Sequence, residues 1–469
     1  MTGSGGSGGW GLIIIDGIDT AIVMGLKDIV DKQLAWIAAQ DFNKTSDPQI
    51  DGFDTTIRLI GGLLSAYDLI QSGLVPYANQ YNKTEVKALL NGAKTLADFL
   101  APIFETDTGL PYFWINTTTR TGFPGPGNTA VDGTIILEYH RLSDLTHDES
   151  YRRVADKAES YLLNPQPPPV YPGLVGSNVD MNTGMFTNEN AGWQSGVDSF
   201  FEYLIKSVVY DPTQEYANDY KNFWTTAVES TSKYLAVHPY GHQELTFITT
   251  LNNTGAPLYE SDDYTCFAGG NFLLGGAYLN RQDFIDLGIA VTDSCHALFN
   301  STTSGLNPLS YGWYGPDNMA AEPQYNGNGS TAVAARENFD EHGYFIRLDA
   351  WGALYTLYPE PIESMMYAWR ITGDTTWQEY SWEVFQSLQA DGNRPPVPMS
   401  SLTDVTQPRA GGQFNDIPRQ VIYYFAETLK YFYLTFSDTD LVSLDDFTFN
   451  TEGHPLRVQR GTCSTSGHR

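Results

Sequence analysis

Positive charge is scarce in this chain of 469 residues, because Lys and Arg together number 26 against 55 Asp and Glu. The formal net charge of -29 disfavours nucleic acids and anionic membrane surfaces as partners, since both repel an acidic protein. Charged residues make up only 17% of the chain, so the acidity reflects few basic residues rather than an acidic tail. Long apolar runs are also missing: none reaches the roughly 18 residues of a membrane-spanning helix.

Cysteine is equally rare, with three residues: Cys266, Cys295 and Cys463. Disulfides persist in oxidising compartments, whereas buried free thiols are the alternative for any pair of these residues. Cys463 lies in a polar tail and is expected to be unpaired. Sequons for N-glycosylation indicate the secretory route as a set, although each one alone is a weak signal. They occur at Asn43, Asn82, Asn116, Asn252, Asn300 and Asn328.

A secretion signal is not evident at the start of the chain, where Gly and Ser dominate residues 1–9. Such a composition is typical of a flexible linker, natural or artificial. No change in composition marks an internal domain boundary. We therefore predict a linker over residues 1–9, a single domain over residues 10–456 and a tail over residues 457–469.

Helical periodicity dominates the rest of the sequence. Pairs of such segments alternate with loops rich in Gly, Pro and Asn, a pattern that favours a toroid of paired helices. Two short extended stretches, Leu245–Thr250 and Phe447–Phe449, are predicted to be strands that line or plug the toroid. Helices are predicted over residues 85–104, 135–145, 151–163, 195–209, 216–235, 281–299, 362–371, 376–388 and 419–436.

Acidic residues recur inside otherwise apolar helical segments. Asp54 and Arg58 share a helix face at the i,i+4 spacing, and an ordinary intrahelical ion pair is the simplest interpretation. Asp198 and Glu202 have the same spacing but like charges, which costs stability unless a cation or a hydroxylated ligand compensates. The local alternative is a solvated acidic face.

Two further acids, Glu360 and Glu363, lie on either side of Pro361, a residue that is favourable at a helix start. Negative charges in the first turn of a helix are also stabilised by the positive end of the helix dipole. The segment Phe449–Leu456, read as FNTEGHPL, offers a hydroxyl, a backbone carbonyl and a carboxylate. Hard cations such as Ca²⁺ bind oxygens of these kinds.

These motifs together resemble the class I α-1,2-mannosidases, glycoside hydrolase family 47. The resemblance rests on Gly9–Gly11, on residues 53–69, 198–206 and 359–374, and on FNTEGHPL. It implies an all-α fold, an (α/α)7 barrel with a C-terminal β-hairpin segment that plugs it. Family members carry a first barrel helix before Gly9, so we expect that an N-terminal stretch, with any secretion signal, is missing from this sequence. A Cys266–Cys295 disulfide is also implied.

The resemblance further implies a role for each acidic motif. Asp54 stands where the family has a glutamate as general acid, and Arg58 would orient it. Asp198 would be a catalytic carboxylate and Glu360 the general base. Residues expected around the metal and the sugar are Thr451 as the Ca²⁺ ligand, Glu363, Glu427 and Glu452 in its water shell, and Glu138, Glu202, Tyr358 and Tyr423 at the substrate.

Four departures from the family pattern bear on activity. Asp54 is one methylene shorter than glutamate, Tyr358 replaces an arginine, Leu309 replaces an acid and Asp263 replaces a histidine. The leading hypothesis is a monomeric, Ca²⁺-dependent, inverting exo-α-mannosidase that trims α-1,2-linked mannose from high-mannose N-glycans in the secretory pathway or outside the cell. A lectin-like glycan-binding protein and a structural toroid are the alternatives. His342 and His454 are expected to be structural.

Overall fold

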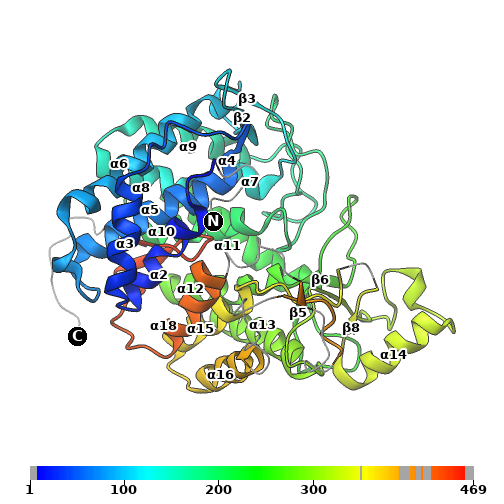
Figure 1. Ribbon diagram of the computed structural model, residues 1–469. Coiled ribbons are helices and arrows are strands. Elements are labelled where there is room, and N and C mark those ends of the chain that lie inside the picture. The colour runs from blue at the N-terminus through cyan, green and yellow to red at the C-terminus, as the bar shows by residue number, and fades with distance from the viewer. Residues whose placement is uncertain (1–7, 349–350, 390–400, 408–413, 416–423, 460–469) are drawn as a thin grey trace.

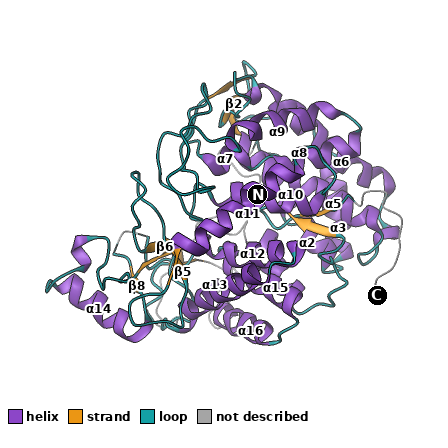
Figure 2. Ribbon diagram, turned by 180° about the vertical axis from the view of Figure 1, so that it is seen from behind, coloured by secondary structure: helices purple, strands orange, loops and turns teal. Residues whose placement is uncertain are grey.

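The computed structural model describes residues 8–348, 351–389, 401–407, 414–415 and 424–459. Helices form a ring, and the strands are short (Figures 1 and 2). Within the described residues, no helix is long and apolar enough to cross a membrane.

Seven inner helices close the ring in the part of the chain that the structure describes. Each packs against the next in chain order, and the last packs against the first. They are α2 (Ile18–Val23), α5 (Gly61–Ser72), α8 (Ile136–Thr146), α10 (Asp198–Tyr210), α12 (Phe267–Leu279), α15 (Glu360–Thr372) and α18 (Leu429–Thr435). The predicted toroid of paired helices is confirmed.

Most inner helices are followed in the chain by an outer helix of their own, which packs against them. The outer helices among the described residues are α3 (Lys27–Ala38), α6 (Lys83–Leu100), α9 (Glu149–Leu162), α11 (Ala217–Ser230), α13 (Gln282–Asn300) and α16 (Thr376–Gln389). Their amphipathic patterns explain their position, since one apolar stripe faces the ring and the opposite face meets water. In α6, for example, Val86, Leu89, Ala93 and Leu96 are buried.

Helix α12 did not appear among the predicted helices, because its sequence FAGGNFLLGGAYL lacks an amphipathic stripe. Residues all around it are buried. Its glycines allow close helix approach: a Cβ on Gly275 would lie 2.0 Å from Trp224, and one on Gly270 would lie 3.0 Å from the Cα of Ser364. The helix therefore packs against neighbours on all sides, and a helix of this kind shows no amphipathic periodicity in its sequence.

Short helical segments connect the longer ones. They are α1 (Leu12–Asp16), α4 (Gly52–Asp54), α7 (Thr129–Gly133), the 3₁₀ turns η2 (Ala78–Gln80), η3 (Ala101–Phe104), η5 (Tyr264–Cys266) and η6 (Pro323–Tyr325), and the π-helical η1 (Thr55–Ile60), η4 (Thr231–Leu235) and η8 (Tyr424–Thr428). Such π-helical turns are frequent at functional sites.

All strand pairs are antiparallel. One sheet has the order β1 (Gln49–Asp51), β2 (Trp114–Asn116), β3 (Thr121–Phe123), and another β6 (Glu260–Asp262), β7 (Ser310–Gly312), β8 (Phe345–Ile346). Three pairs stand alone: β4 (Ala236–Val237) with β5 (Phe247–Ile248), β9 (Ser401–Leu402) with β10 (Phe414–Asn415), and β11 (Phe447–Phe449) with β12 (Pro455–Arg457).

The C-terminal hairpin β11–β12 lies inside the ring, where β11 packs on α10 and β12 on α5. Phe447, Phe449 and Leu456 are fully buried there. Its turn contains Gly453 at φ 66°, a left-handed conformation that glycine adopts without strain. The predicted plug is thus confirmed, and it carries Thr451 and Glu452 in its turn.

The strand predicted within residues 245–250 does not line the ring. Only Phe247–Ile248 form a strand, β5, and Phe247 packs against Tyr311 and Trp313 in a second hydrophobic core. Helix α14 (Ser330–His342), which was not predicted, belongs to the same core. Figures 1 and 2 show β5, β6, β8 and α14 together at one side of the helical ring.

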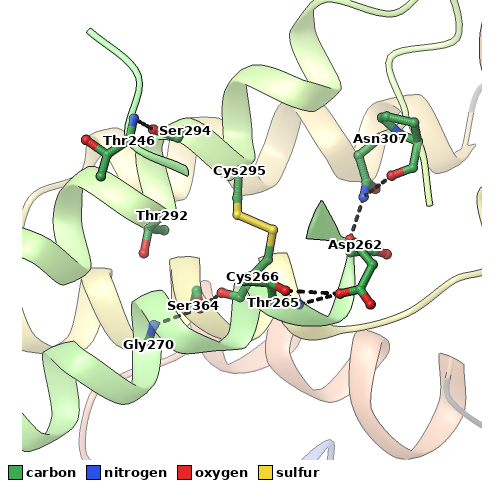
Figure 3. Close-up of a disulfide and its surroundings, with 12 residues drawn as sticks. Thr246, Asp262, Thr265, Cys266, Gly270, Thr292, Ser294, Cys295, Asn307 and Ser364 are labelled. Carbon is green, nitrogen blue, oxygen red and sulfur yellow. Dashed lines mark hydrogen bonds between the residues drawn. A yellow bond between two sulfur atoms is a disulfide. The ribbon is translucent and has the colours of Figure 1, made fainter. Parts of the chain in front are cut away.

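The disulfide implied by the resemblance is present between Cys266 and Cys295 (Figure 3). It ties η5, which leads into α12, to the neighbouring outer helix α13. Ser364 of α15 donates a hydrogen bond to the Cys266 carbonyl at 2.5 Å and accepts one from the Gly270 amide at 2.8 Å. The free-thiol alternative is therefore wrong for this pair, whereas Cys463 lies outside the described residues.

A buried ion network anchors the hairpin to the start of the chain. His454 contacts Asp19 at 2.7 Å and Asp16 at 3.1 Å, and Lys430 contacts Asp19 at 2.8 Å. Burial alone would lower the pKa of His454, but the charge of Asp19 and the hydrogen bonds that the imidazolium donates to both aspartates raise it to about 9. His454 thus has a structural environment, as expected from the sequence.

We predict that His454→Gln destabilises the fold in a pH-dependent way. The folded pKa lies above the ordinary value of 6.5, so the stabilisation is full below pH 6.5 and is lost as pH rises through about 9. Urea unfolding should show a loss of about 3 kcal/mol at pH 6 that shrinks towards pH 10.

His296 provides the matched control, because burial lowers its pKa to about 4 and it is neutral across this range. For His296→Gln the loss should be constant between pH 8 and pH 10 and smaller, not larger, at pH 6, because only the unfolded imidazole binds a proton there. A pH-independent loss for His454→Gln would contradict the charged state that we assign.

Candidate active site

Acidic side chains from five helical segments converge around the hairpin turn. Asp198 and Glu360 are the first residues of α10 and α15, where the helix dipole favours a negative charge. Asp54 ends α4, Glu138 belongs to α8 and Glu427 to η8. Few cations face them, chiefly Arg58 and Lys206, so the cluster carries an excess of carboxylates.

Arg58 holds the first part of this cluster together. Its Nη1 forms an ion pair with Glu452 and lies 3.5 Å from Asp16 Oδ2. Its Nε donates to Asp54 Oδ1 at 3.2 Å, so the i,i+4 ion pair expected from the sequence is present. The Asp54 side chain is nevertheless 43% exposed, whereas that of Arg58 is only 7% exposed. Asp54 is therefore the most accessible carboxyl of this group.

Glu427 and Glu452 form a hydrogen-bonded carboxyl pair at the floor of the cluster. Burial raises the pKa of Glu452 to about 7, although Arg58 opposes the shift. Burial and the charge of Glu452 raise the pKa of Glu427 well above its ordinary value. Two buried carboxyls in contact hold protons near neutral pH unless a cation neutralises them.

Lys206 joins two further acids, which lie on the inner helices α10 and α15. Its Nζ forms an ion pair with Glu202, one turn earlier on α10, and lies 3.1 Å from Glu363 Oε1 on α15. The like-charge spacing of Asp198 and Glu202 is thus compensated in part by an internal cation. Burial raises the pKa of Glu363 to about 7 even so.

Glu138 connects α8 to the hairpin turn. Its Oε1 accepts hydrogen bonds from Tyr203 Oη at 2.7 Å and from Asn450 Nδ2 at 2.8 Å. Tyr203 Oη in turn accepts from the Thr451 amide at 3.3 Å. Burial raises the pKa of Glu138 to about 7. These contacts fix the backbone of Thr451 within the ring.

Asp198 and Glu360 lie among other carboxyls rather than beside cations. Burial, with the charges of Asp262 and Glu202, raises the pKa of Asp198 to about 7. Burial and the charge of Asp263 raise the pKa of Glu360 well above its ordinary value. Glu360 Oε2 is buried and has no hydrogen-bond partner among the described residues. Asp198 is therefore suited to proton transfer near neutral pH, and Glu360 accepts a proton more readily than an exposed glutamate would.

Two departures from the family pattern fall directly beside Glu360. Asp263 is buried, accepts a hydrogen bond from Asn307 Nδ2 at 2.5 Å and adds negative charge next to Glu360. The Tyr358 ring packs against Tyr264, with ring centroids 4.6 Å apart. An aromatic pair thus occupies the position where the resemblance implies an arginine.

The predicted site residues are brought together with one exception: Tyr423 lies outside the described residues. Asp51 was not predicted, although it is the N-cap of α4 and accepts a hydrogen bond from the Asp54 amide at 3.0 Å. Burial and the charge of Asp54 raise the pKa of Asp51 to about 7. The signal in the sequence was an aspartate three residues before Asp54, a spacing typical of helix N-caps.

The cluster can perform acid–base chemistry on an acetal, in which one carbon is bonded to two oxygens. Glycoside hydrolysis requires one carboxyl that donates a proton to the leaving oxygen and another that activates water. Asp54 is exposed enough to meet a ligand, and Glu360 is a desolvated carboxyl whose Oε2 has no partner among the described residues. No group of three or more His, Cys, Asp or Glu side chains in the described ranges is arranged to hold a metal ion.

The chain is similar to known proteins over nearly its whole length. The chain is 40% identical over 465 residues to a probable mannosyl-oligosaccharide α-1,2-mannosidase 1B of Aspergillus clavatus, covering 96% of this chain and 85% of the relative. It is 39% identical over 461 residues to a mannosyl-oligosaccharide α-1,2-mannosidase of Penicillium citrinum, with the same coverage.

Among solved structures, an α-1,2-mannosidase from Trichoderma reesei superimposes with a TM-score of 0.87 at 36% identity, over 96% of this chain and 91% of that chain. The sequence profile of glycosyl hydrolase family 47 matches residues 2–458. The chain therefore belongs to glycosyl hydrolase family 47 and is a glycoside hydrolase.

Proposed function

We propose that this protein is an inverting exo-α-mannosidase that removes terminal α-1,2-linked mannose from high-mannose N-glycans or related mannosides. The observation that carries the proposal is the group of desolvated carboxyls at Asp198, Glu138 and Glu360, whose raised pKa values suit acid–base catalysis near neutral pH. The names of the relatives supply the sugar and the linkage.

In the proposed mechanism Glu360 is the general base. It takes a proton from a water molecule while the water oxygen bonds to C1 of the terminal mannose. Asp54 donates a proton, through an intervening water, to the glycosidic oxygen as the C1–oxygen bond breaks. The product is β-mannose, because the water attacks the face opposite to the leaving group. Asp198 assists the acid or, as an alternative, serves as the base.

Calcium is the cofactor that we infer, held by Thr451. The donors around it are all oxygens, which suits a hard cation, and water would link the ion to Glu363, Glu427 and Glu452. The raised pKa of each of these acids fits the need for a positive charge at this floor. When bound, Ca²⁺ would polarise vicinal mannose hydroxyls and favour distortion of the ring.

The remaining inferences concern the wall of the site and the setting of the protein. Arg58 would orient Asp54, while Glu138, Glu202 and Tyr358, together with Tyr423, would contact the sugar. We infer a monomer in the secretory pathway or outside the cell, supported by the sequons and by the disulfide. The lectin-like alternative draws on the short acid Asp54 and its contact with Arg58.

The first prediction for this function is calcium-dependent release of β-mannose. High-mannose N-glycan and α-1,2-mannobiose should both be cleaved, and NMR of the first product should show the β anomer. EDTA should abolish release, and excess Ca²⁺ should restore it. Calcium should also raise the unfolding temperature of the wild type but not of Thr451→Ala, because ligand binding stabilises only a fold that binds it. Mannose binding without release would favour the lectin-like alternative, and release of α-mannose would contradict inversion.

A second prediction concerns the base. Glu360→Gln should lower kcat by about 10³-fold, within the range for loss of a general base, while the affinity for mannobiose remains. Glu379→Gln is the matched control, because Glu379 lies in the first turn of the outer helix α16 and is exposed. Turnover by Glu360→Gln close to that of the control would contradict the assignment and favour Asp198 as the base.

A third prediction concerns the shortened acid. Asp54→Asn should lower kcat/KM for a natural mannoside by about 10²-fold, because a proton donor is lost. Asp54→Glu should retain or raise activity, since the longer side chain reaches further towards the leaving oxygen. Single-turnover assays with an activated aryl mannoside, whose leaving group needs no protonation, should show a much smaller loss for Asp54→Asn. An equal loss on both substrates would point to a positioning role.

A further inference from the structure

A second group of buried acids lies outside the candidate active site, between α7 and the outer helix α9, which pack against each other. Asp132 belongs to α7, whereas Asp156 and Glu159 lie one turn apart on α9. Asp132 is only 3% exposed and Glu159 only 1%. The proposed chemistry at the mannose uses none of the three, so their burial needs another explanation.

Asp156 is the compensated member of this group. His140 Nε2 lies 2.8 Å from Asp156 Oδ1, and Tyr220 Oη donates to the same oxygen at 3.4 Å. Arg152 Nη1 donates to His140 Nδ1 at 3.2 Å, so the neutral imidazole carries its proton on Nε2, where it points at Asp156. Asp156 therefore has donors from two neighbouring helices.

Glu159, by contrast, has no such partner. Both of its carboxyl oxygens are buried and accept no hydrogen bond within the described part of the chain. Burial, together with the negative charges of Asp156 and Asp132, raises the pKa of Glu159 well above its ordinary value. A buried carboxylate without a partner is far less favourable than a buried neutral acid. The neutral acid is therefore the favoured form of Glu159.

Asp132 is also buried, but it lies closer to solvent. The loop over residues 124–128 covers it: a Cβ on Gly127 would lie 3.9 Å from Asp132 Oδ1, and residues 124–127 are exposed. Burial raises the pKa of Asp132 to about 8. A modest rise of pH above neutral is therefore enough to remove its proton, and the new charge lies next to Glu159.

Other charged or titratable side chains on the neighbouring elements do not act as counter-ions for Asp132 and Glu159. Arg153 and Lys157 of α9 are exposed, and Lys221 of α11 contacts Asn218. Tyr216 and Tyr220 of α11 face Asp156 and Glu159 as neutral phenols, since their pKa values are raised. On α8 and α10 the pairs are Glu138 with Tyr203, Arg141 with Asp68, Asp144 with Arg152, and Lys206 with Glu202 and Glu363, while Asp198 faces Asp262 and Glu202.

Helix α7 supports the chain on both sides of Asp198. The Ala130 amide donates to the Gly196 carbonyl at 3.0 Å, and the hydroxyls of Thr134 and Ser199 are hydrogen-bonded at 2.7 Å. The packing is tight, because a Cβ on Gly133 would lie 2.5 Å from Phe200 Cδ2 and 3.0 Å from Leu162 Cδ1. A displacement of α7 from α9 therefore removes support from Asp198.

We propose that the carboxyls of Asp132 and Glu159 form a proton-operated latch, which keeps α7 docked on α9 while both are neutral and releases it when they ionise in alkaline solution. Both are positioning residues, since they act on Asp198 only through α7. The latch goes beyond the proposed function and does not depend on the sugar or the linkage.

The direction of the pH dependence follows from the protons. The docked state binds protons that the open state loses, so opening of α7 is rarest in acid and becomes more frequent as pH rises towards about 8. The acidic side of this window is set by the ordinary pKa values of the two acids, 3.8 and 4.5.

Infrared difference spectroscopy at pH 7 tests the protonation state directly. The spectrum of wild type minus Glu159→Gln should contain the carbonyl stretch of a protonated carboxyl, with a shift in D₂O. Glu149→Gln is the matched control, because Glu149 lies on the same helix and its side chain is 63% exposed, so its difference spectrum should contain carboxylate bands only. Carboxylate bands for Glu159 as well would overturn the latch.

Hydrogen exchange with mass spectrometry tests the opening and needs no turnover. After correction for the intrinsic rates, opening of residues 129–134 in wild type should become about tenfold more frequent per pH unit, for each proton released, between pH 5 and pH 8. Asp132→Asn should reduce this dependence by about tenfold per unit, and Glu149→Gln should leave it unchanged. Residues 197–202 should open together with α7. Opening that does not depend on pH, or continued protection of residues 197–202 while α7 opens, would contradict the proposal.

Discussion

Burial of many carboxyls with few cations is the constraint on which the rest of this structure depends. The ring of inner helices excludes water from its centre, and the C-terminal hairpin inserts there. Carboxyls in that position are unfavourable unless they are paired, protonated or bound to a cation. Arg58 and Lys206 each bridge two or more acids. Even acids that these cations contact, Glu363 and Glu452, have raised pKa values. The pKa values of Asp198 and Glu360, which face other carboxyls, are raised as well. Stability and chemistry thus make opposite demands on the same centre.

The hairpin illustrates how the fold meets both demands. Its far side is fixed by the contacts of His454 with Asp16 and Asp19, all buried and well paired. Its near side presents Thr451 and Glu452 to the cluster. A firmly held backbone can carry an uncompensated group, because the cost of burying it is offset elsewhere in the same element. The ion network around His454 therefore supports the positions of Thr451 and Glu452. His454 and Thr451 have separate roles, although both belong to the connection between β11 and β12.

Much of this arrangement could be predicted from the sequence, and different parts of it could be predicted for different reasons. The outer helices follow amphipathic periodicity, and the acidic motifs were recognised by their resemblance to a family. Helix α12 was missed because it is buried on all sides, and α14 because it belongs to a second core. The strand predicted at Leu245–Thr250 was placed wrongly, since alternation does not reveal which core a strand faces. The contact of Lys206 with Glu363 and the surroundings of Glu360 depend on side chains from different helices, which only tertiary structure brings together.

Three of the four departures from the family pattern, those at Tyr358, Leu309 and Asp263, can be understood together rather than as separate losses. Tyr358 and Leu309 remove one positive and one negative charge from the wall near Glu360, while Asp263 adds a negative one in place of a histidine. The local balance therefore shifts towards negative charge, which strengthens Glu360 as a base by raising its pKa. The same change makes the wall less polar on the side of Tyr264 and Tyr358. One redistribution of charge thus changes both the strength of the base and the polarity of the wall beside it.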